Sequence, residues 1–172
     1  MRLADEFEGS HRLRMHIDCN QDEGILVYPY FESTLLAMIN DHAELVHTQR
    51  KKILRHVAEA IQELHSKNWI HIGISQNFNT SLHTRQLRSP YLDIKPDNIL
   101  VNSKGGETKE ITDAVLGDFD IAYHLEDGKA LRTRHAIGNA MWRSPEGQTA
   151  VGVTKASDIY SFGLVVSRSC FY

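Results

Sequence analysis

The sequence is poor in cysteine, in long apolar runs and in net charge, and each shortage excludes a class of protein. Cys19 and Cys170 are far apart and belong to no metal-type spacing, so neither a disulfide framework nor a zinc site is predicted. No apolar run approaches the length of a membrane span, and the first residues lack the apolar stretch of a signal peptide. The formal net charge of -3 gives no electrostatic reason to expect binding to nucleic acid or to an anionic membrane. We therefore expect a soluble intracellular protein, cytoplasmic or nuclear, whose partners include neither nucleic acid nor membrane.

The composition is that of an ordinary globular domain. The 172 residues are 41% apolar and 24% charged, which is enough for one domain with a hydrophobic core. The ten histidines include no pair with the helical spacing and carboxylate context of a catalytic zinc motif. We therefore interpret them as solvated or packed imidazoles rather than as metal ligands.

The most informative segment runs from Asp93 to Asn102 and reads DIKPDNILVN. It contains an acidic residue, a lysine two positions later and an asparagine five positions later, followed by an apolar run. Phosphoryl transfer needs a carboxylate to orient a hydroxyl, a cation near the moving phosphate and an amide oxygen for a metal. The segment therefore indicates a loop that takes part in phosphoryl transfer.

Two further motifs follow in order. The segment Val115–Asp120 reads VLGDFD and places a second carboxylate, Asp118, after a β-type run, and Ser144-Pro145-Glu146 comes later. Together the motifs resemble the catalytic loop, the metal-binding loop and the end of the activation segment of a eukaryotic-type protein kinase domain. The resemblance implies an α+β fold, namely a partial protein kinase-like fold with a mainly helical large lobe and short β-hairpins.

By this resemblance, four residues carry the chemistry. Asp93 orients or accepts the proton of a protein hydroxyl, and Lys95 neutralises charge on the transferred phosphoryl group. Asn98 and Asp118 are the magnesium ligands, and ATP and Mg²⁺ are the cofactors. A lysine at position 95 resembles serine/threonine kinases more than tyrosine kinases, so a protein serine or threonine is the expected acceptor.

The resemblance also implies a nucleotide-binding hinge. Tyr28 occupies the gatekeeper position, and Pro29, Tyr30 and Phe31 form the strip that faces adenine. Pro29 has no N–H, but its position uses the backbone carbonyl, and Phe31 supplies the amide donor. Leu100, in the apolar run after the catalytic loop, is the remaining expected nucleotide contact.

Local patterns predict several helices and strands. Apolar residues recur at helical spacing from Thr48 to His65, which predicts one long amphipathic helix. A shorter helix is expected to open at Ser33. Strand-like residues 98–102 and 111–116, joined by a turn at 103–106, predict a hairpin that brings Asn98 near Asp118. Also expected are a strand at Asn68–His71 and, by resemblance, a buried helix at Ser157–Val166.

The expected domain map is a partial kinase domain over residues 1–172. Residues 1–31 correspond to the end of the small lobe and the hinge, and residues 32–172 to a truncated large lobe. Resemblance also predicts that His71 packs against Phe119 and that Asp158 hydrogen-bonds the backbone around the catalytic loop. Glu146 is expected to lack the arginine partner that it has in the family.

Residues 72–91 separate His71 from the catalytic loop, although the family has the two nearly adjacent. The segment has neither a sustained period nor a charge pattern, so we predict an insertion. Two origins stay open: a retained intron translated in a gene model, or an extruded, solvent-exposed loop.

Other departures bear on activity. Leu92 stands where many kinases have an arginine that pairs with a phosphorylated activation segment, Asp120 replaces a glycine, and Asn139 replaces a threonine. Neither Gly-x-Gly-x-x-Gly nor Val-Ala-x-Lys precedes the hinge. A non-catalytic kinase-like scaffold is therefore the alternative to an enzyme. A small-molecule kinase is disfavoured by the Ser144-Pro145-Glu146 motif.

Overall fold

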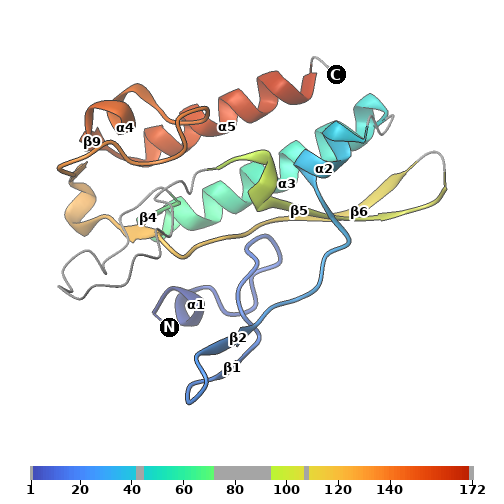
Figure 1. The fold of residues 1–172 in the computed structure, drawn as a ribbon, viewed down its shortest axis with the longest axis horizontal. Helices are drawn as coiled ribbons and strands as arrows, with labels where there is room; N and C mark the ends of the chain where they lie inside the picture. Colours follow the sequence, from blue (N-terminus) through green and yellow to red (C-terminus); the bar gives the residue numbers. More distant parts are fainter. Residues whose placement is uncertain (1, 42–44, 72–93, 107–108, 171–172) are drawn as a thin grey trace. The chain divides into compact units, whose positions relative to one another are not determined.

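The computed structural model describes residues 2–41, 45–71, 94–106 and 109–170 (Figure 1). They form two compact units: unit 1 contains residues up to 60 and residues 96–117, and unit 2 contains the described residues from 61 to 95 and from 118 to 170. The domain boundary expected at residue 31 lies inside unit 1 and stays a prediction. Residues 72–93, which include the segment 72–91, Leu92 and Asp93, lie outside the described residues.

Unit 1 combines helices with two small antiparallel sheets. One sheet has the order β1-β2 and the other the order β3-β5-β6. The elements are α1 (Arg2–Glu6), β1 (Asp18–Asn20), β2 (Ile25–Val27), β3 (Ser33–Thr34), α2 (Leu35–Asn40), the first part of α3 (His47–Ser66), the 3-10 turn η2 (Pro96–Asn98), β5 (Ile99–Lys104) and β6 (Glu110–Leu116).

The β5–β6 hairpin is the longest sheet feature of unit 1, as Figure 1 shows in yellow-green and yellow. Ile99 pairs with Leu116, so the predicted hairpin is confirmed. The pairing extends into the predicted turn, because Lys104 pairs with Glu110 beyond an irregularity at Asn102 and Ser103. The hairpin thereby fixes Leu100 opposite Val115.

The long predicted helix is confirmed as α3, which runs from His47 to Ser66. The centre of its apolar face is buried, with Ile53 and Val57 in unit 1 and Leu64 in unit 2. Full burial of one aliphatic side chain contributes roughly 1.5–3 kcal/mol, so this face is a main source of the helix's stability.

The short helix α2 begins one residue later than predicted. Thr34 is its N-cap, and the Thr34 Oγ1 accepts a hydrogen bond of 3.1 Å from the Ala37 N–H. Ser33 instead pairs with Val101 across the sheet. Both hydroxyl residues suit an N-cap, so composition could not choose between them.

Unit 2 contains two short β-ladders and the C-terminal helices. The ladder β4–β7 confirms the strand predicted after α3, and β8 pairs with β9. The elements are the end of α3, β4 (Trp69–Ile70), β7 (Tyr123–His124), the 3-10 turn η3 (Glu126–Gly128), β8 (Leu131–Arg132), α4 (Pro145–Thr149), β9 (Val151–Val153) and α5 (Lys155–Cys170). Their core is the buried cluster Ile70, Leu125, Leu131, Ile137 and Val153.

The helix α5 confirms the buried helix predicted at Ser157–Val166, and it extends beyond that range at both ends. Its N-terminus is capped twice: Thr154 Oγ1 accepts from the Ala156 N–H, and Ser157 Oγ accepts from the Thr154 N–H. At the other end the Ser169 hydroxyl donates to the Val165 carbonyl at 2.8 Å.

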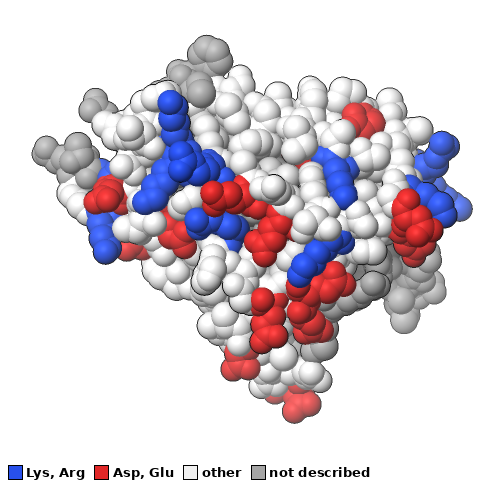
Figure 2. All heavy atoms as spheres, turned by 180° about the vertical axis from the view of Figure 1, so that it is seen from behind, with Lys and Arg blue, Asp and Glu red and all other residues white. Residues whose placement is uncertain are grey.

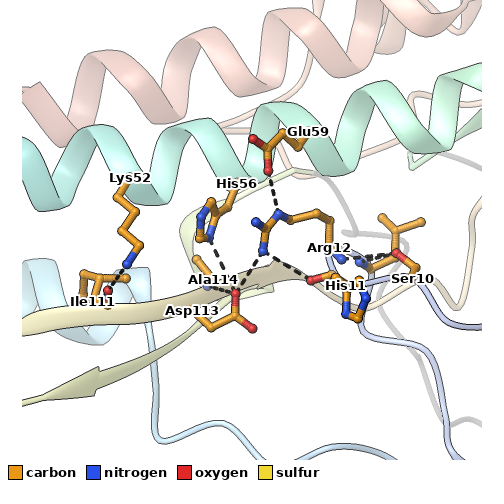
Figure 3. Close-up of polar contacts among 10 residues, drawn as sticks. Ser10, His11, Arg12, Lys52, His56, Glu59, Ile111, Asp113 and Ala114 are labelled. Carbon is orange, nitrogen blue, oxygen red and sulfur yellow. Dashed lines mark hydrogen bonds and ion pairs between the residues drawn. The ribbon is translucent and has the colours of Figure 1, made fainter.

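A polar cluster around Arg12 joins three elements of unit 1 (Figure 3). Arg12 Nε donates to Glu59 of α3 at 2.6 Å, and Arg12 Nη1 donates to Asp113 of β6 at 3.0 Å. The His56 ring lies beside the same carboxylate, with 3.6 Å between Nδ1 and Asp113 Oδ1. The cluster thereby ties the N-terminal segment of unit 1 to a helix and a strand distant in sequence.

Charges of both signs are interspersed on the face seen in Figure 2. This mixing agrees with the small net charge of -3. Within the part of the chain that the structure describes, no helix is long and apolar enough to cross a membrane.

Candidate functional site

The predicted hinge residues belong to unit 1 and differ widely in exposure. Tyr30 is 80% exposed, whereas Tyr28, Pro29 and Phe31 are half-buried. The chain after the hinge is tied to β5 by reciprocal bonds: the Glu32 N–H donates to Asn102 Oδ1 at 3.0 Å, and the Ser103 N–H donates to the Glu32 carboxylate at 3.2 Å. The hinge strip is therefore anchored to the hairpin that carries Leu100.

Asn98 and Leu100 lie close to Gly117 in unit 1. Asn98 is buried at the end of η2, and its carbonyl accepts from the Gly117 N–H at 2.9 Å. A Cβ on Gly117 would lie 2.6 Å from Leu100 Cδ1, so the absence of a side chain lets Leu100 pack there. Sequence reasoning did not single out Gly117, although its place directly before Asp118 was a usable signal.

Asp118 belongs to unit 2 and has an unusual backbone. Its φ of 63° lies in the left-handed region, which residues other than glycine rarely adopt and which often marks a functional position. Burial and the nearby Asp120 raise the pKa of Asp118, and the charges of His71 and Lys95 lower it by a smaller amount. The expected proximity of Asp118 to Asn98 stays a prediction, because the two residues belong to different units.

His71 and Asp158 form the framework of this part of unit 2. The His71 ring packs against Phe119, with centroids 5.1 Å apart, which confirms the predicted contact. The His71 N–H donates to Asp158 Oδ2 at 3.0 Å, which confirms the predicted role of Asp158. Both His71 and Asp158 are fully buried, so this bond is shielded from water.

His65 is a further partner of Asp158 that sequence reasoning missed. Its Nε2 lies 2.8 Å from Asp158 Oδ2, the oxygen that His71 also contacts. The predicted helix contained His65, but nothing in the helical pattern distinguished a packed imidazole from one bound to a buried carboxylate. The aspartate thus links the end of α3, the strand β4 and the helix α5.

The end of the activation segment is held by side-chain contacts within unit 2. Arg143 Nε donates to the Gly138 carbonyl at 3.0 Å, and the Ser161 hydroxyl donates to the Trp142 carbonyl at 2.7 Å. Asn139, at the position where the family has threonine, accepts from the Met141 N–H at 3.0 Å through its side chain. These contacts give the segment a defined backbone.

Glu146, which is expected to lack the arginine partner that it has in the family, accepts a hydrogen bond from Ser157. The distance from the Ser157 hydroxyl to Glu146 Oε1 is 2.7 Å. Burial raises the pKa of Glu146, but hydrogen bonds from Ser157, from its own backbone and from Ser144 outweigh burial and lower that pKa overall. The carboxylate therefore stays ionised and joins α4 to α5.

The predicted catalytic pair is described in part. Lys95 is half-buried in unit 2, and its charge acts on Asp118, whereas Asp93 lies outside the described residues. Among the residues that the structure describes, no three His, Cys, Asp or Glu side chains gather as a metal-binding group. The predicted magnesium ligands are instead one amide and one carboxylate, a donor set that suits Mg²⁺ when phosphate oxygens and water complete the coordination.

The chain is similar to known protein kinases in sequence and fold. The family model of the protein kinase domain matches residues 80–171, so the match begins inside the segment 72–91. The chain is 30% identical over 149 residues to the L-type lectin-domain containing receptor kinase S.1 of Arabidopsis thaliana, which covers 85% of this chain and 19% of that protein. It is 32% identical over 103 residues to the serine/threonine-protein kinase PrkC of Bacillus subtilis, which covers 60% of this chain and 15% of that protein.

A solved structure shares the fold. A chain in the crystal structure of the yeast RNA Pol II CTD kinase complex matches with a TM-score of 0.71 at 16% identity, over 98% of this chain and 47% of that one. The α+β, partial kinase-like fold predicted from the motifs is thereby confirmed. The chain spans about a fifth of the length of the first curated relatives that it matches. With a family match over more than half of its length, this chain belongs to the protein kinase domain family.

Proposed function

We propose that this chain carries the phosphoryl-transfer residues of a protein kinase that moves the γ-phosphate of ATP to a serine or threonine hydroxyl of a protein, in the cytoplasm or nucleus. The observation that supports this most strongly is the state of Asp118. It has a left-handed backbone, it is desolvated, and Lys95 and His71 both act on its charge. Desolvation and backbone strain of this kind are concentrated at functional sites.

The proposed roles follow from the side-chain chemistry. Asp93 orients the acceptor hydroxyl and takes its proton, and Lys95 offsets negative charge on the transferred group. Asn98 and Asp118 would hold Mg²⁺, whose positive charge would screen the phosphates when it is bound. The raised pKa of Asp118 next to Asp120 fits this role, because a cation relieves the repulsion between two carboxylates.

Serine/threonine specificity has two supports. Lys95 occupies the position where serine/threonine kinases carry a lysine, and PrkC of Bacillus subtilis is named a serine/threonine-protein kinase. The likeness to that relative is 32% identity over 103 residues, so the acceptor residue is part of the proposal.

A non-catalytic scaffold is the alternative. The sequence contains neither Gly-x-Gly-x-x-Gly nor Val-Ala-x-Lys, the motifs that grip the nucleotide phosphates in the family. Tyr30 in the hinge strip and Met141 in the activation segment are 80% and 70% exposed, as residues that bind a partner protein would be.

The test is transfer of phosphate from radiolabelled ATP to casein in the presence of Mg²⁺. We expect phosphoserine and phosphothreonine in the acid hydrolysate, and a loss of about a hundredfold or more in Asp93→Asn and in Asp118→Asn. Asp22→Asn, an exchange at an exposed carboxylate, is the matched control and should keep full activity. Phosphotyrosine would contradict the acceptor specificity. Absence of transfer with retained Mg²⁺-dependent nucleotide binding would favour the scaffold.

A further inference from the structure

Arg14 reaches the backbone carbonyl of the hinge from a neighbouring segment of unit 1. Its Nε donates a hydrogen bond of 2.9 Å to the Pro29 carbonyl oxygen. Its guanidinium carbon also lies 5.0 Å from the centroid of the Tyr28 ring, within the range of a cation–π contact. One side chain thus contacts both the predicted gatekeeper Tyr28 and Pro29, the first residue of the strip that is expected to face adenine.

The position of Arg14 is fixed at its backbone and along its stem. The Arg14 N–H donates to the Leu116 carbonyl at 2.8 Å, which places Arg14 beside the end of β6. Arg14 Cβ and Cδ each lie 3.6 Å from the point that a Cβ on Gly117 would occupy. The side chain therefore bridges from Gly117 to the Pro29 carbonyl, and Gly117 is also where Leu100 packs.

This placement matters because of what Pro29 can offer a base. Pro29 has no N–H, so its carbonyl oxygen is its one backbone hydrogen-bonding group. The adenine 6-amino group is a donor and needs such an acceptor. A guanidinium carries only donors, so Arg14 both occupies the oxygen and presents N–H groups where the amino group would bond.

A carbonyl oxygen has two lone pairs, so the direction of approach decides whether it can still accept from a base. Arg14 Cδ is next to Gly117 and its Nε, the adjacent atom, bonds Pro29. The side chain therefore comes from the side of Gly117 and Leu100, where the predicted nucleotide contact Leu100 lies. Adenine would have to displace the guanidinium to use the same oxygen.

We propose that Arg14 is a specificity-determining residue that prevents the hinge from reading the 6-amino group of adenine. The inference rests on the proposed function, since it assumes that Pro29 and Leu100 face the base. It adds that binding depends on the ribose, the phosphates and the remaining hinge contacts, and that a purine without the amino group binds as well as adenine does.

The first test uses the unaltered chain with ADP and with purine riboside 5′-diphosphate, which lacks the 6-amino group but keeps N1. Both are titrated with Mg²⁺ by ligand-observed NMR, which is suited to weak binding. If Arg14 holds the Pro29 carbonyl, the two dissociation constants should agree within about twofold, because the amino group gains no hydrogen bond. Binding of ADP about tenfold tighter than of the purine analogue would overturn the inference.

The second test removes the donors. Arg14→Met keeps an unbranched stem beside Gly117 and frees the Pro29 carbonyl, so ADP should bind about tenfold tighter while the purine analogue changes little. Arg55→Met, at an exposed arginine of α3, is the matched control and should leave both constants unchanged. The thermal unfolding midpoint of each variant verifies that it is folded.

The outcomes separate this inference from the proposed function. Equal gains for both ligands in Arg14→Met, or no gain for ADP, would overturn the role of Arg14 while nucleotide binding stands. If neither the unaltered chain nor Arg14→Met binds either ligand, the proposed function is overturned and the inference falls with it. If Arg14→Met does not fold, the comparison of the two ligands on the unaltered chain still decides.

Discussion

His56 is buried between cations and carboxylates, and this links its protonation to the stability of unit 1. Figure 3 shows its ring beside Asp113 and Arg12, and the charges of Glu59 and Lys52 also act on it. Burial, followed by the charge of Arg12, lowers the pKa of His56 below 6.5, while Asp113 and Glu59 raise it and Lys52 lowers it. The Nδ1 atom is buried and has no hydrogen-bond partner. The folded chain therefore binds a proton at His56 less readily than the unfolded chain does.

The sign of the pH effect follows from this difference. As the pH falls, the unfolded state takes up the proton at a higher pH than the folded state does. The contribution of neutral His56 to the free energy of unfolding is therefore present above about pH 6.5 and is lost as the pH falls through the lower pKa of the folded state. In His56→Gln, the drop in melting temperature between about pH 7.5 and about pH 5.5 should be smaller by about 2 °C. Circular dichroism melts measure this. His135→Gln, at an exposed histidine, should keep the unaltered pH dependence.

Among individual residues, the sequence predicted contacts that family motifs imply and missed contacts that depend on this chain's own packing. His71 against Phe119 and Asp158 on the His71 backbone were predictable, because both residues of each pair lie in recognisable motifs. The hydrogen bond from Arg14 to the Pro29 carbonyl was not predictable. An arginine in a polar, charged segment is ordinarily solvated, and only the fold places this one beside the hinge.

At the scale of elements, Arg12 connects the segment before β1 to α3 and β6. Its partners Glu59 and Asp113 are 43% and 41% exposed, so solvent weakens each ion pair, but one guanidinium serves both. Arg12→Met should therefore lower the melting temperature by about 2–4 °C, roughly 1 kcal/mol. Arg55→Met on the exposed face of α3 is the control. An unchanged melting temperature in Arg12→Met would show that the cluster contributes no net stability.

Ser157 holds the start of α5 to α4 through a single hydroxyl. The hydroxyl accepts from the Thr154 N–H at 3.2 Å and donates to Glu146 at 2.7 Å, and Ser157 is fully buried. Removing the Ser157 hydroxyl leaves the Thr154 N–H and the Glu146 carboxylate without this partner. Ser157→Ala should therefore lower the free energy of unfolding by about 1–3 kcal/mol. Ser167→Ala, at an exposed serine of the same helix, should cost less than about 0.5 kcal/mol. Chemical denaturation of both variants makes the comparison. Equal losses would contradict the assigned role.

Helices and strands were predicted well where the apolar pattern repeats over many residues. Their ends were predicted less well. The apolar stripe of α3 extends over several turns, so its existence and bounds were readable. The start of α2 was misplaced because Ser33 and Thr34 are both good N-caps, and only the pairing of Ser33 with Val101 decides between them. The end of α5 was placed too early, because Ser167 to Cys170 breaks the resemblance without breaking the helix.

At the scale of the whole molecule, the order of the motifs was sufficient to predict the family, and the division into units was not predictable. The three motifs follow one another within residues 93–146, and three matches in the family order arise by chance far less often than one match does. The division at residues 60 and 61 falls inside α3, whose apolar period continues across it without a break. The periodic pattern predicts which face of a helix is buried. It does not predict which unit each part of that face belongs to.

This chain is expected to bind Mg-ATP weakly. It contains the predicted hinge strip and the predicted magnesium ligands Asn98 and Asp118, but its sequence has neither Gly-x-Gly-x-x-Gly nor Val-Ala-x-Lys, the motifs that bind the phosphates in the family. We therefore expect a dissociation constant weaker than about 100 μM, since a major group of phosphate contacts is missing. Isothermal titration of the 172-residue chain with Mg-ATP measures it, and Asp118→Asn should weaken it further. A low-micromolar constant would show that the residues present here bind the nucleotide without those motifs.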